Sequence, residues 1–335
     1  MIETTDFYFQ WHITDVCNNR CRHCYHVDYD KKNELSEADL IRLAAQIEDV
    51  LEKWNFYGSM SITGGEPFTR RKELLSLLNF IENRCSRVVY YDILTNGTLL
   101  TDEDIISLKK YQKLRRIQVS LEGADANTHD AVRGLNDFEK VTRAIKKLKA
   151  NNITVSVMTT LTKKNMNTIP DLIKLLGDLG VDYFALERFM PEGRGATNIE
   201  WTLTKEDTKK IFEYMTGQAF KIKKPHLLLY RTLYCLCSED KTIGAMCSAG
   251  VSALTILPDA TLLPCRRLPI AIGNALKDGI INTWYNSELL WHLRDYKSYK
   301  GKCNGCEHFF ECRGCRSMAY LAYQDYMQED PQCWR

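Results

Sequence analysis

The sequence lacks an excess of charge of either sign. Its 45 basic and 43 acidic residues leave a formal charge of +2, so the basic surface of a nucleic-acid-binding or membrane-binding protein is not expected. No apolar run reaches the roughly 18 residues that span a bilayer. The polar, acidic start of the chain is unlike a signal peptide, and neither repeats nor low-complexity segments occur. We therefore expect a globular protein of the cytoplasm, without nucleic-acid or membrane partners.

Cysteine is the residue type that stands out. The chain has 13 cysteines, of which three fall within positions 17–24 and five within positions 303–333. In a reducing cytoplasm, thiols do not persist as disulfides. Clustered cysteines in such a chain indicate metal ligands, whereas Cys85, alone at the end of a predicted helix, is expected to be a buried thiol.

The first 190 residues alternate between short apolar segments and amphipathic helices, which predicts an α/β fold with a parallel sheet. The predicted strands are Phe7–Thr14, Ser59–Thr63, Val88–Leu94, Arg116–Leu121, Ile153–Thr159 and Asp182–Glu187. Ser36 is expected to cap one helix and Thr101 the next. Six βα units make a partial (β/α)6 barrel of the TIM type, in which chemistry lies at the carboxyl ends of the strands.

The pattern changes near residue 200, which predicts three segments along the chain. Residues 1–200 form the partial barrel, residues 201–234 a helical linker, and residues 235–335 a small α+β domain held by metal, since this part has few long apolar periodic runs. A β-hairpin is expected at residues 253–264, turning at Pro258-Asp259-Ala260.

Three cysteines follow the first predicted strand, namely Cys17, Cys21 and Cys24. The polar and charged residues between them argue against a buried helical face, so a metal site is indicated. A [4Fe-4S] cluster ordinarily takes four cysteines. Three thiolates leave one iron open to a substrate, as in catalytic metal sites. Zinc is the weaker alternative, because a structural zinc ion takes four protein ligands.

Four motifs follow the cysteine triad in order, namely Thr63-Gly64-Gly65-Glu66-Pro67, Leu94-Thr95-Asn96-Gly97, Val119-Ser120-Leu121-Glu122-Gly123 and Arg133-Gly134. Together with the triad they resemble the radical S-adenosylmethionine (SAM) superfamily over about residues 7–195. The resemblance implies that Glu66 and the glycines before it bind the methionine amino group of SAM, while Ser120 and Arg133 bind its carboxylate or ribose region. Glu122 stands where the family more often has Asp. The SAM-binding residues implied in this way are Tyr25, Gly64, Gly65, Glu66, Asn96, Ser120 and Arg133.

The cysteines of the C-terminal part resemble the SPASM extension of radical SAM enzymes, which carries two auxiliary [4Fe-4S] clusters. Only five residues separate Cys303-x2-Cys306 from Cys312-x2-Cys315, which is too short a gap for a zinc ribbon. The resemblance assigns Cys247, Cys265 and Cys315 to the first auxiliary cluster. It assigns the second cluster to Cys303, Cys306, Cys312 and Cys333. The chain would thus hold three [4Fe-4S] clusters and SAM.

The cysteine array departs from the SPASM pattern in three places. Ala260 stands where the hairpin usually has Gly, and two residues instead of three separate Cys312 from Cys315. The first auxiliary cluster has only three motif cysteines. Its fourth ligand is then Cys237 or Cys235, or the site is open to substrate.

The resemblance implies an enzyme that cleaves SAM reductively to a 5′-deoxyadenosyl radical and abstracts a hydrogen atom from its substrate. The substrate is expected to be a ribosomally made peptide or protein, with tetrapyrrole or redox-cofactor biosynthesis as the alternative. A non-enzymatic electron-transfer protein is a second alternative, which the SAM motifs disfavour. Partners would be an external one-electron reductant of the flavodoxin or ferredoxin type and a separate leader-peptide recognition protein. Arg266 and Arg267 either bind substrate carboxylates or form salt bridges.

Overall fold

The computed structural model describes residues 5–240 and 242–335, which form two compact units that are each discontinuous in sequence. The first unit comprises residues up to Asn18 together with Asp28–Gln118 and Ser248–Arg294. The second unit comprises Asn19–Val27, Val119–Cys247 and Asp295–Arg335. No helix of the described residues is long and apolar enough to cross a membrane.

The first unit is built on a largely parallel sheet. Its strands follow one another in the order β10-β9-β8-β1-β2-β3-β4. Their bounds are β1 Phe7–His12, β2 Gly58–Thr63, β3 Val88–Thr95, β4 Leu114–Ser120, β8 Ala253–Ile256, β9 Thr261–Leu263 and β10 Gly273–Asn274. Strand β1 is parallel both to β2 and to β8, so the predicted hairpin β8–β9 extends the sheet beyond the first strand.

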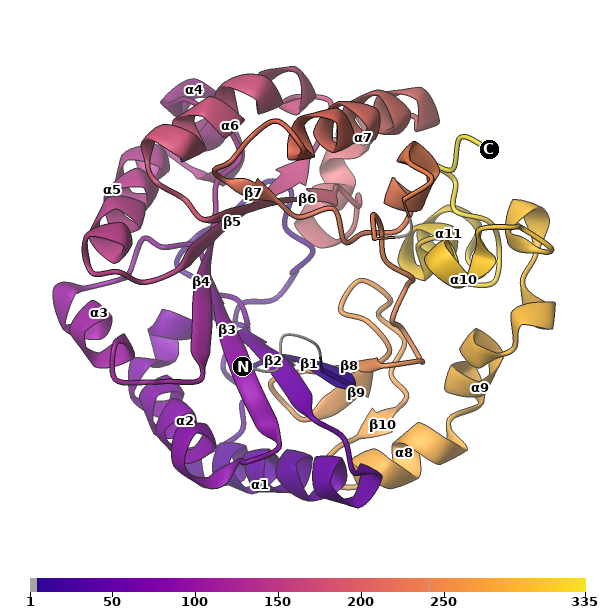
Figure 1. Ribbon diagram of the computed structural model, residues 1–335. Coiled ribbons are helices and arrows are strands. Elements are labelled where there is room, and N and C mark those ends of the chain that lie inside the picture. Colours follow the sequence, from indigo (N-terminus) through magenta and orange to yellow (C-terminus); the bar gives the residue numbers. More distant parts are fainter. Residues whose placement is uncertain (1–4, 241) are drawn as a thin grey trace. The chain divides into compact units, whose positions relative to one another are not determined.

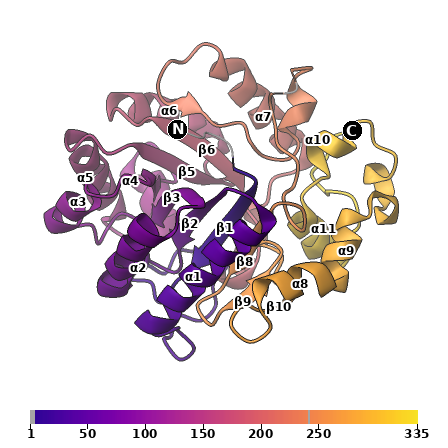
Figure 2. The same ribbon diagram turned by 60° about the horizontal axis from the view of Figure 1, so that its bottom comes forward.

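Helices of the first unit pack beside one another along this sheet. Helix α1 lies next to α2 and α8 (Figures 1 and 2). Ser36 Oγ accepts a hydrogen bond from Asp39 N at 3.1 Å, and Thr101 caps α3 through a capping box, as predicted. The bounds are α1 Glu37–Trp54, η1 Pro67–Arg70, α2 Arg71–Arg84, α3 Asp102–Leu108, α8 Ile280–Asn286 and α9 Glu288–Arg294.

The second unit continues the alternation of strands and helices. Strands β5 Val155–Leu161, β6 Tyr183–Arg188 and β7 His226–Leu227 are parallel neighbours. The helices are α4 Ala126–Arg133, α5 Asp137–Ala150, η2 Met166–Thr168, α6 Ile169–Asp178, η3 Gly193–Trp201, α7 Lys205–Ala219, η4 Tyr234–Cys237, η5 Tyr296–Ser298, η6 Gly301–Cys303, α10 Phe309–Cys312 and α11 Arg316–Tyr323. After α7 no helix of the described residues exceeds eight residues, so little regular structure holds this part of the chain.

The predicted α/β class is confirmed, because all six expected strands form within two residues of their predicted starts. The hairpin at residues 253–264 is confirmed as well, and the predicted helical linker contains helix α7. Cys85 is the expected buried thiol, with 1% of its surface exposed. The division of the sequence at residues 200 and 235 stays a prediction.

Candidate active site and cysteine clusters

The turn after β2 packs against the loop that follows β1. Gly65 N donates to Thr14 O at 2.7 Å, and Glu66 N donates to Val16 O at 2.8 Å. A Cβ on Gly65 would lie 2.4 Å from Val16 O, so only glycine permits this approach. The loop that leads to Cys17 is therefore held by the backbone of the predicted SAM motif.

Glu66 is fully buried and joins the ends of two neighbouring strands. Its carboxylate accepts hydrogen bonds from Thr95 Oγ1 at 2.8 Å and Asn96 N at 2.7 Å, beyond the end of β3. It also accepts one from Phe68 N at 3.1 Å. These donors fix the turn at the carboxyl ends of β2 and β3, which is the edge where barrels of this type place their chemistry.

Asn96 connects that strand edge to the first cysteine of the triad. Its Nδ2 lies 3.8 Å from Cys17 Sγ and donates to Asn18 Oδ1 at 2.9 Å. Asn96 is buried, and its own Oδ1 accepts from Thr98 N at 2.9 Å. The side-chain amide is thereby oriented with its donor group toward the sulfur.

The other two triad cysteines, Cys21 and Cys24, belong to the second unit. Arg133 Nη1 lies 3.9 Å from Cys21 Sγ, and His26 N donates to Cys24 Sγ at 3.4 Å. Arg133 pairs with Glu122, because Arg133 Nη2 donates to Glu122 Oε1 at 2.7 Å. Although burial opposes ionisation of Glu122, Arg133 holds the pKa of that carboxyl below its usual range.

His23 is a residue of this site that the sequence reasoning missed. Its Nε2 lies 3.5 Å from Glu122 Oε1, and burial lowers the pKa of the imidazole to about 4. The neutral ring therefore packs between the triad loop and the acidic residue after β4. Its place between Cys21 and Cys24 was the available signal.

Ser120 and Tyr25 are two further residues that the sequence predicts to bind SAM. Ser120 is the last residue of β4 and is partly buried, two positions before Glu122. The ring of Tyr25 lies 4.9 Å from that of His26. The turn at Gly193 packs so closely on Tyr25 that a Cβ there would lie 2.2 Å from its carbonyl oxygen.

Cys265 lies in the first unit, directly before Arg266. Burial raises the pKa of Asp15 to about 6, and the positive charge of Arg266 counteracts part of this rise. Arg266 is therefore close to the segment that leads into Cys17. This proximity to an acidic side chain agrees with the salt-bridge interpretation of Arg266.

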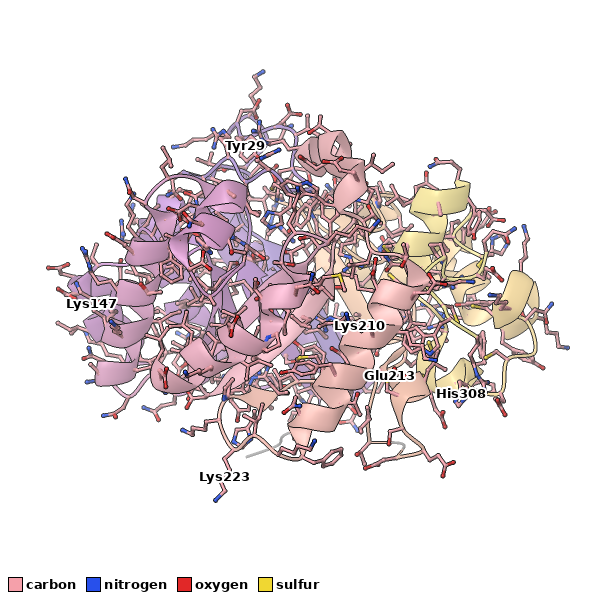
Figure 3. All side chains as sticks on the ribbon, turned by 90° about the horizontal axis from the view of Figure 1, so that it is seen from above. Tyr29, Lys147, Lys210, Glu213, Lys223 and His308 are labelled. Atoms are coloured by element: carbon pink, nitrogen blue, oxygen red, sulfur yellow. The ribbon has the colours of Figure 1, made fainter. Side chains whose placement is uncertain are left out.

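Four cysteines line one cavity of the second unit, and they are the four assigned to the second auxiliary cluster: Cys303, Cys306, Cys312 and Cys333. Lys302, Arg313 and Arg335 line the same cavity together with one carboxylate, Asp330, and with His308, which Figure 3 labels. The positive charges of the three basic residues outnumber that of the acid, which suits an anionic group among the four sulfurs.

Backbone donors point at the most buried of these sulfurs. Leu233 N and Gly314 N each lie 3.4 Å from Cys312 Sγ. Cys312 also shares a hydrogen bond with the thiol of Cys235, which raises the pKa of Cys312 and lowers that of Cys235. Hydrogen bonds to sulfur are the means by which proteins tune iron–sulfur clusters.

Cys237, the other candidate for the first auxiliary cluster, faces helix α7. Burial raises its pKa to about 11, and its thiol shares a hydrogen bond with Thr216 near Glu213, which Figure 3 labels. Cys247 N donates a hydrogen bond at 3.0 Å to the carbonyl oxygen of Cys312, one of the four cysteines that line the cavity. Cys315 N donates to Asp330 Oδ2 at 2.8 Å.

Comparison with known families decides the identity of this arrangement. The radical SAM superfamily profile matches residues 11–176, and the profile of the SPASM iron–sulfur cluster-binding domain matches residues 247–307. The chain belongs to the radical SAM superfamily. It is a radical SAM enzyme whose C-terminal part carries a SPASM domain.

Relatives of this radical SAM enzyme cover nearly its whole length. The AdoMet-dependent heme synthase of Methanosarcina barkeri is 29% identical over 96% of this chain and 95% of its own length. The mycofactocin maturase MftC of Mycolicibacterium smegmatis is 28% identical over 96% of this chain and 81% of its own. Streptococcus suis SuiB bound to its precursor peptide SuiA shares the fold, with a TM-score of 0.78 at 19% identity over 98% and 76% of the two chains.

The donor set of the radical SAM enzyme fits iron–sulfur clusters. Amide, guanidinium and backbone N–H groups approach the sulfurs of Cys17, Cys21, Cys24 and Cys312 at 3.4–3.9 Å, as at clusters whose potentials depend on such bonds. Within residues 5–240 and 242–335, no three His, Cys, Asp or Glu side chains are arranged around a single metal ion.

Proposed function

We propose that this radical SAM enzyme abstracts a hydrogen atom from a peptide, and that Cys17, Cys21 and Cys24 hold the SAM-cleaving cluster. The observation that carries this proposal is that Asn96 and Arg133, two residues of the SAM motifs, direct N–H groups toward Cys17 Sγ and Cys21 Sγ. Side chains expected to bind SAM thus contact the expected cluster ligands.

When bound, the reduced cluster supplies one electron that cleaves SAM to methionine and a 5′-deoxyadenosyl radical, which takes a hydrogen atom from a substrate carbon. The electron comes from an external donor of the flavodoxin or ferredoxin type in the cytoplasm. Gly64 and Gly65 let the turn after β2 pack closely on the loop that leads to Cys17, and Glu66 fixes the strand ends that carry the site. Ser120 and Arg133 would orient the SAM carboxylate or ribose, and Tyr25 would contribute to SAM binding.

We further propose three [4Fe-4S] clusters, two of them auxiliary. The shared cavity supports Cys303, Cys306, Cys312 and Cys333 as ligands of one, and Cys247, Cys265 and Cys315 belong to the other. The fourth ligand of that cluster is Cys237 or Cys235, or the site is open to substrate. In this proposal residues 1–200 form the barrel that binds SAM, residues 201–234 form a linker, and residues 235–335 form the domain that binds the auxiliary clusters.

The peptide class is supported by similarity to a maturase and by the fold shared with a complex that contains a precursor peptide. A separate leader-recognition protein would then present the peptide. A tetrapyrrole is the second candidate, because the heme synthase matches over 95% of its own length. Two adjacent arginines, Arg266 and Arg267, suit the carboxylates of either substrate.

The decisive experiment is anaerobic incubation of the reconstituted protein with dithionite and SAM, followed by quantification of 5′-deoxyadenosine. Cys17→Ala, Cys21→Ala and Cys24→Ala should each abolish its release, whereas the control Cys85→Ala should retain it. Release in any triad variant would refute the cluster assignment. Adding a candidate peptide or a propionate-bearing tetrapyrrole, with mass analysis of the product, distinguishes the two substrate classes.

A further inference from the structure

Arg316 is a fully buried cation next to the cysteine array. It begins helix α11 directly after Cys315, and none of its surface is exposed. Its Nη1 donates to Tyr326 O at 2.8 Å and to Gln328 O at 2.6 Å. Its Nη2 donates to Cys303 Sγ at 3.5 Å, and the guanidinium carbon lies 4.9 Å from the centre of the Tyr299 ring.

No carboxylate neutralises Arg316 within the described part of the chain. The acids in this region bond elsewhere: Glu329 accepts from Lys302 N at 2.7 Å, and the oxygens of Asp330 accept from Arg188 at 2.7 and 3.0 Å and from Cys315 N at 2.8 Å. The side-chain hydrogen bonds of Arg316 go to backbone carbonyls and to one sulfur. Burying a charge without a counter-charge is costly, so the arrangement indicates an anion on the side of Cys303.

The backbone between Cys312 and Cys315 is shaped to allow this contact. Gly314 has a φ of +57°, and a Cβ there would lie 2.6 Å from Arg316 Nη2 and 3.2 Å from Cys303 Sγ. A side chain at position 314 would therefore displace the guanidinium from the sulfur. The same turn places Gly314 N on Cys312 Sγ at 3.4 Å, so one short loop directs donors toward two cysteines of the cavity.

We propose that Arg316 is the counter-charge of the auxiliary cluster bound by Cys303 and that it raises the reduction potential of that cluster. The inference rests on the proposed assignment of Cys303, Cys306, Cys312 and Cys333. Reduction adds one electron to the cluster. A buried positive charge that donates to a ligand sulfur therefore stabilises the reduced form more than the oxidised form. Arg316 thus acts as a positioning residue that makes this cluster a better acceptor for an electron leaving the substrate.

The test is an anaerobic redox titration of the auxiliary clusters, followed by EPR. A background with Cys17→Ala, Cys21→Ala and Cys24→Ala removes the signal of the SAM cluster, and the signal lost with Cys333→Ala identifies the second auxiliary cluster. In Arg316→Met, reduction should become about tenfold less favourable, which corresponds to about 59 mV for one electron. Arg316→Lys keeps the charge and should shift the potential by less than half as much.

Lys149→Met is the matched control, because Lys149 is a cation of the same unit that pairs with Asp182 and not with a sulfur. It should leave the potential unchanged. An unchanged potential in Arg316→Met, at full iron content, overturns the inference. If Arg316→Met and Arg316→Gln lose the iron of this cluster while Arg316→Lys retains it, the counter-charge role is supported; loss in all three overturns it. Unchanged iron in Cys303→Ala would instead refute the cluster assignment on which the inference rests.

Discussion

Arg133 directs two of its nitrogens, Nε and Nη2, at the same oxygen of Glu122, at 3.0 and 2.7 Å. The side chains of the pair are 10% and 1% exposed, respectively. The second carboxylate oxygen of Glu122 accepts from Thr160 N at 2.8 Å, at strand β5. The acid after β4 thereby fixes the guanidinium that is expected to contact SAM.

Glu122→Gln should therefore destabilise the protein. Breaking a buried ion pair leaves Arg133 without its counter-charge, which costs about 3–5 kcal/mol of unfolding free energy. Denaturant unfolding of the reconstituted protein measures this loss. The exposed Glu139 on α5 provides the control, since Glu139→Gln should change stability by less than about 0.5 kcal/mol. Equal stabilities of the two variants would show that the pair does not hold this edge.

Cys333 should be indispensable for one auxiliary cluster, because it lines the same cavity as Cys303, Cys306 and Cys312. Three [4Fe-4S] clusters correspond to about 12 irons per chain, and loss of one leaves about 8. A chain cut before Cys333 should lose about four irons and still bind SAM. Iron analysis beside Cys85→Ala, which should keep all its iron, checks this. Full iron content in the shortened chain would remove Cys333 from the ligands.

Arg266 should affect product formation more than SAM cleavage. It follows Cys265 and lies near Asp15, outside the predicted SAM motifs. In Arg266→Ala, release of 5′-deoxyadenosine without substrate should stay within about twofold of the parent, and product should fall by about tenfold or more, the effect of losing one charged hydrogen bond. Parallel measurement of both quantities decides the matter. An equal loss of both would assign Arg266 to the structure alone.

The stabilisation from Asp182 should disappear in acid. Although burial opposes its ionisation, hydrogen bonds from Lys149 and from Val155 N hold the pKa of Asp182 below its usual range. Since the folded protein prefers the ionised form, the contribution is complete above about pH 4, the value for an unfolded Asp, and is lost as the pH falls through the folded pKa.

Asp182→Asn should accordingly lower the unfolding free energy by about 2 kcal/mol at pH 7. The difference from the parent should shrink below about pH 4. Urea unfolding at several pH values measures it, with the exposed Asp178→Asn as the control. A difference that stays constant down to pH 3 would mean that the charge of Asp182 contributes nothing.

Local patterns predicted the strands and the helix caps, because period and capping residues are written in neighbouring positions. The role of Glu66 illustrates what such patterns omit. The sequence predicts that it binds an ammonium group, and the structure adds that Thr95, Asn96 and Phe68 donate to it. Those donors come from two strand ends, and no local pattern encodes their meeting.

Charge compensation was equally invisible in the sequence. Arg316 and Arg188 are both buried arginines. Only the structure shows that Arg188 pairs with Asp330, whereas Arg316 donates to Cys303 Sγ. His23 was likewise overlooked between two ligands, since a histidine beside a cysteine has no spacing rule that predicts its burial against Glu122.

The parallel pairing of β1 with β8 has a consequence for synthesis of the chain. Tyr8 lies opposite Ala253, so β1 gains its second neighbour only after the chain from β1 to β8 has been made. Such distant pairings slow folding, and an open strand edge in a nascent chain invites association with other chains. A chaperone that covers the nascent β1 should therefore raise the yield of folded protein.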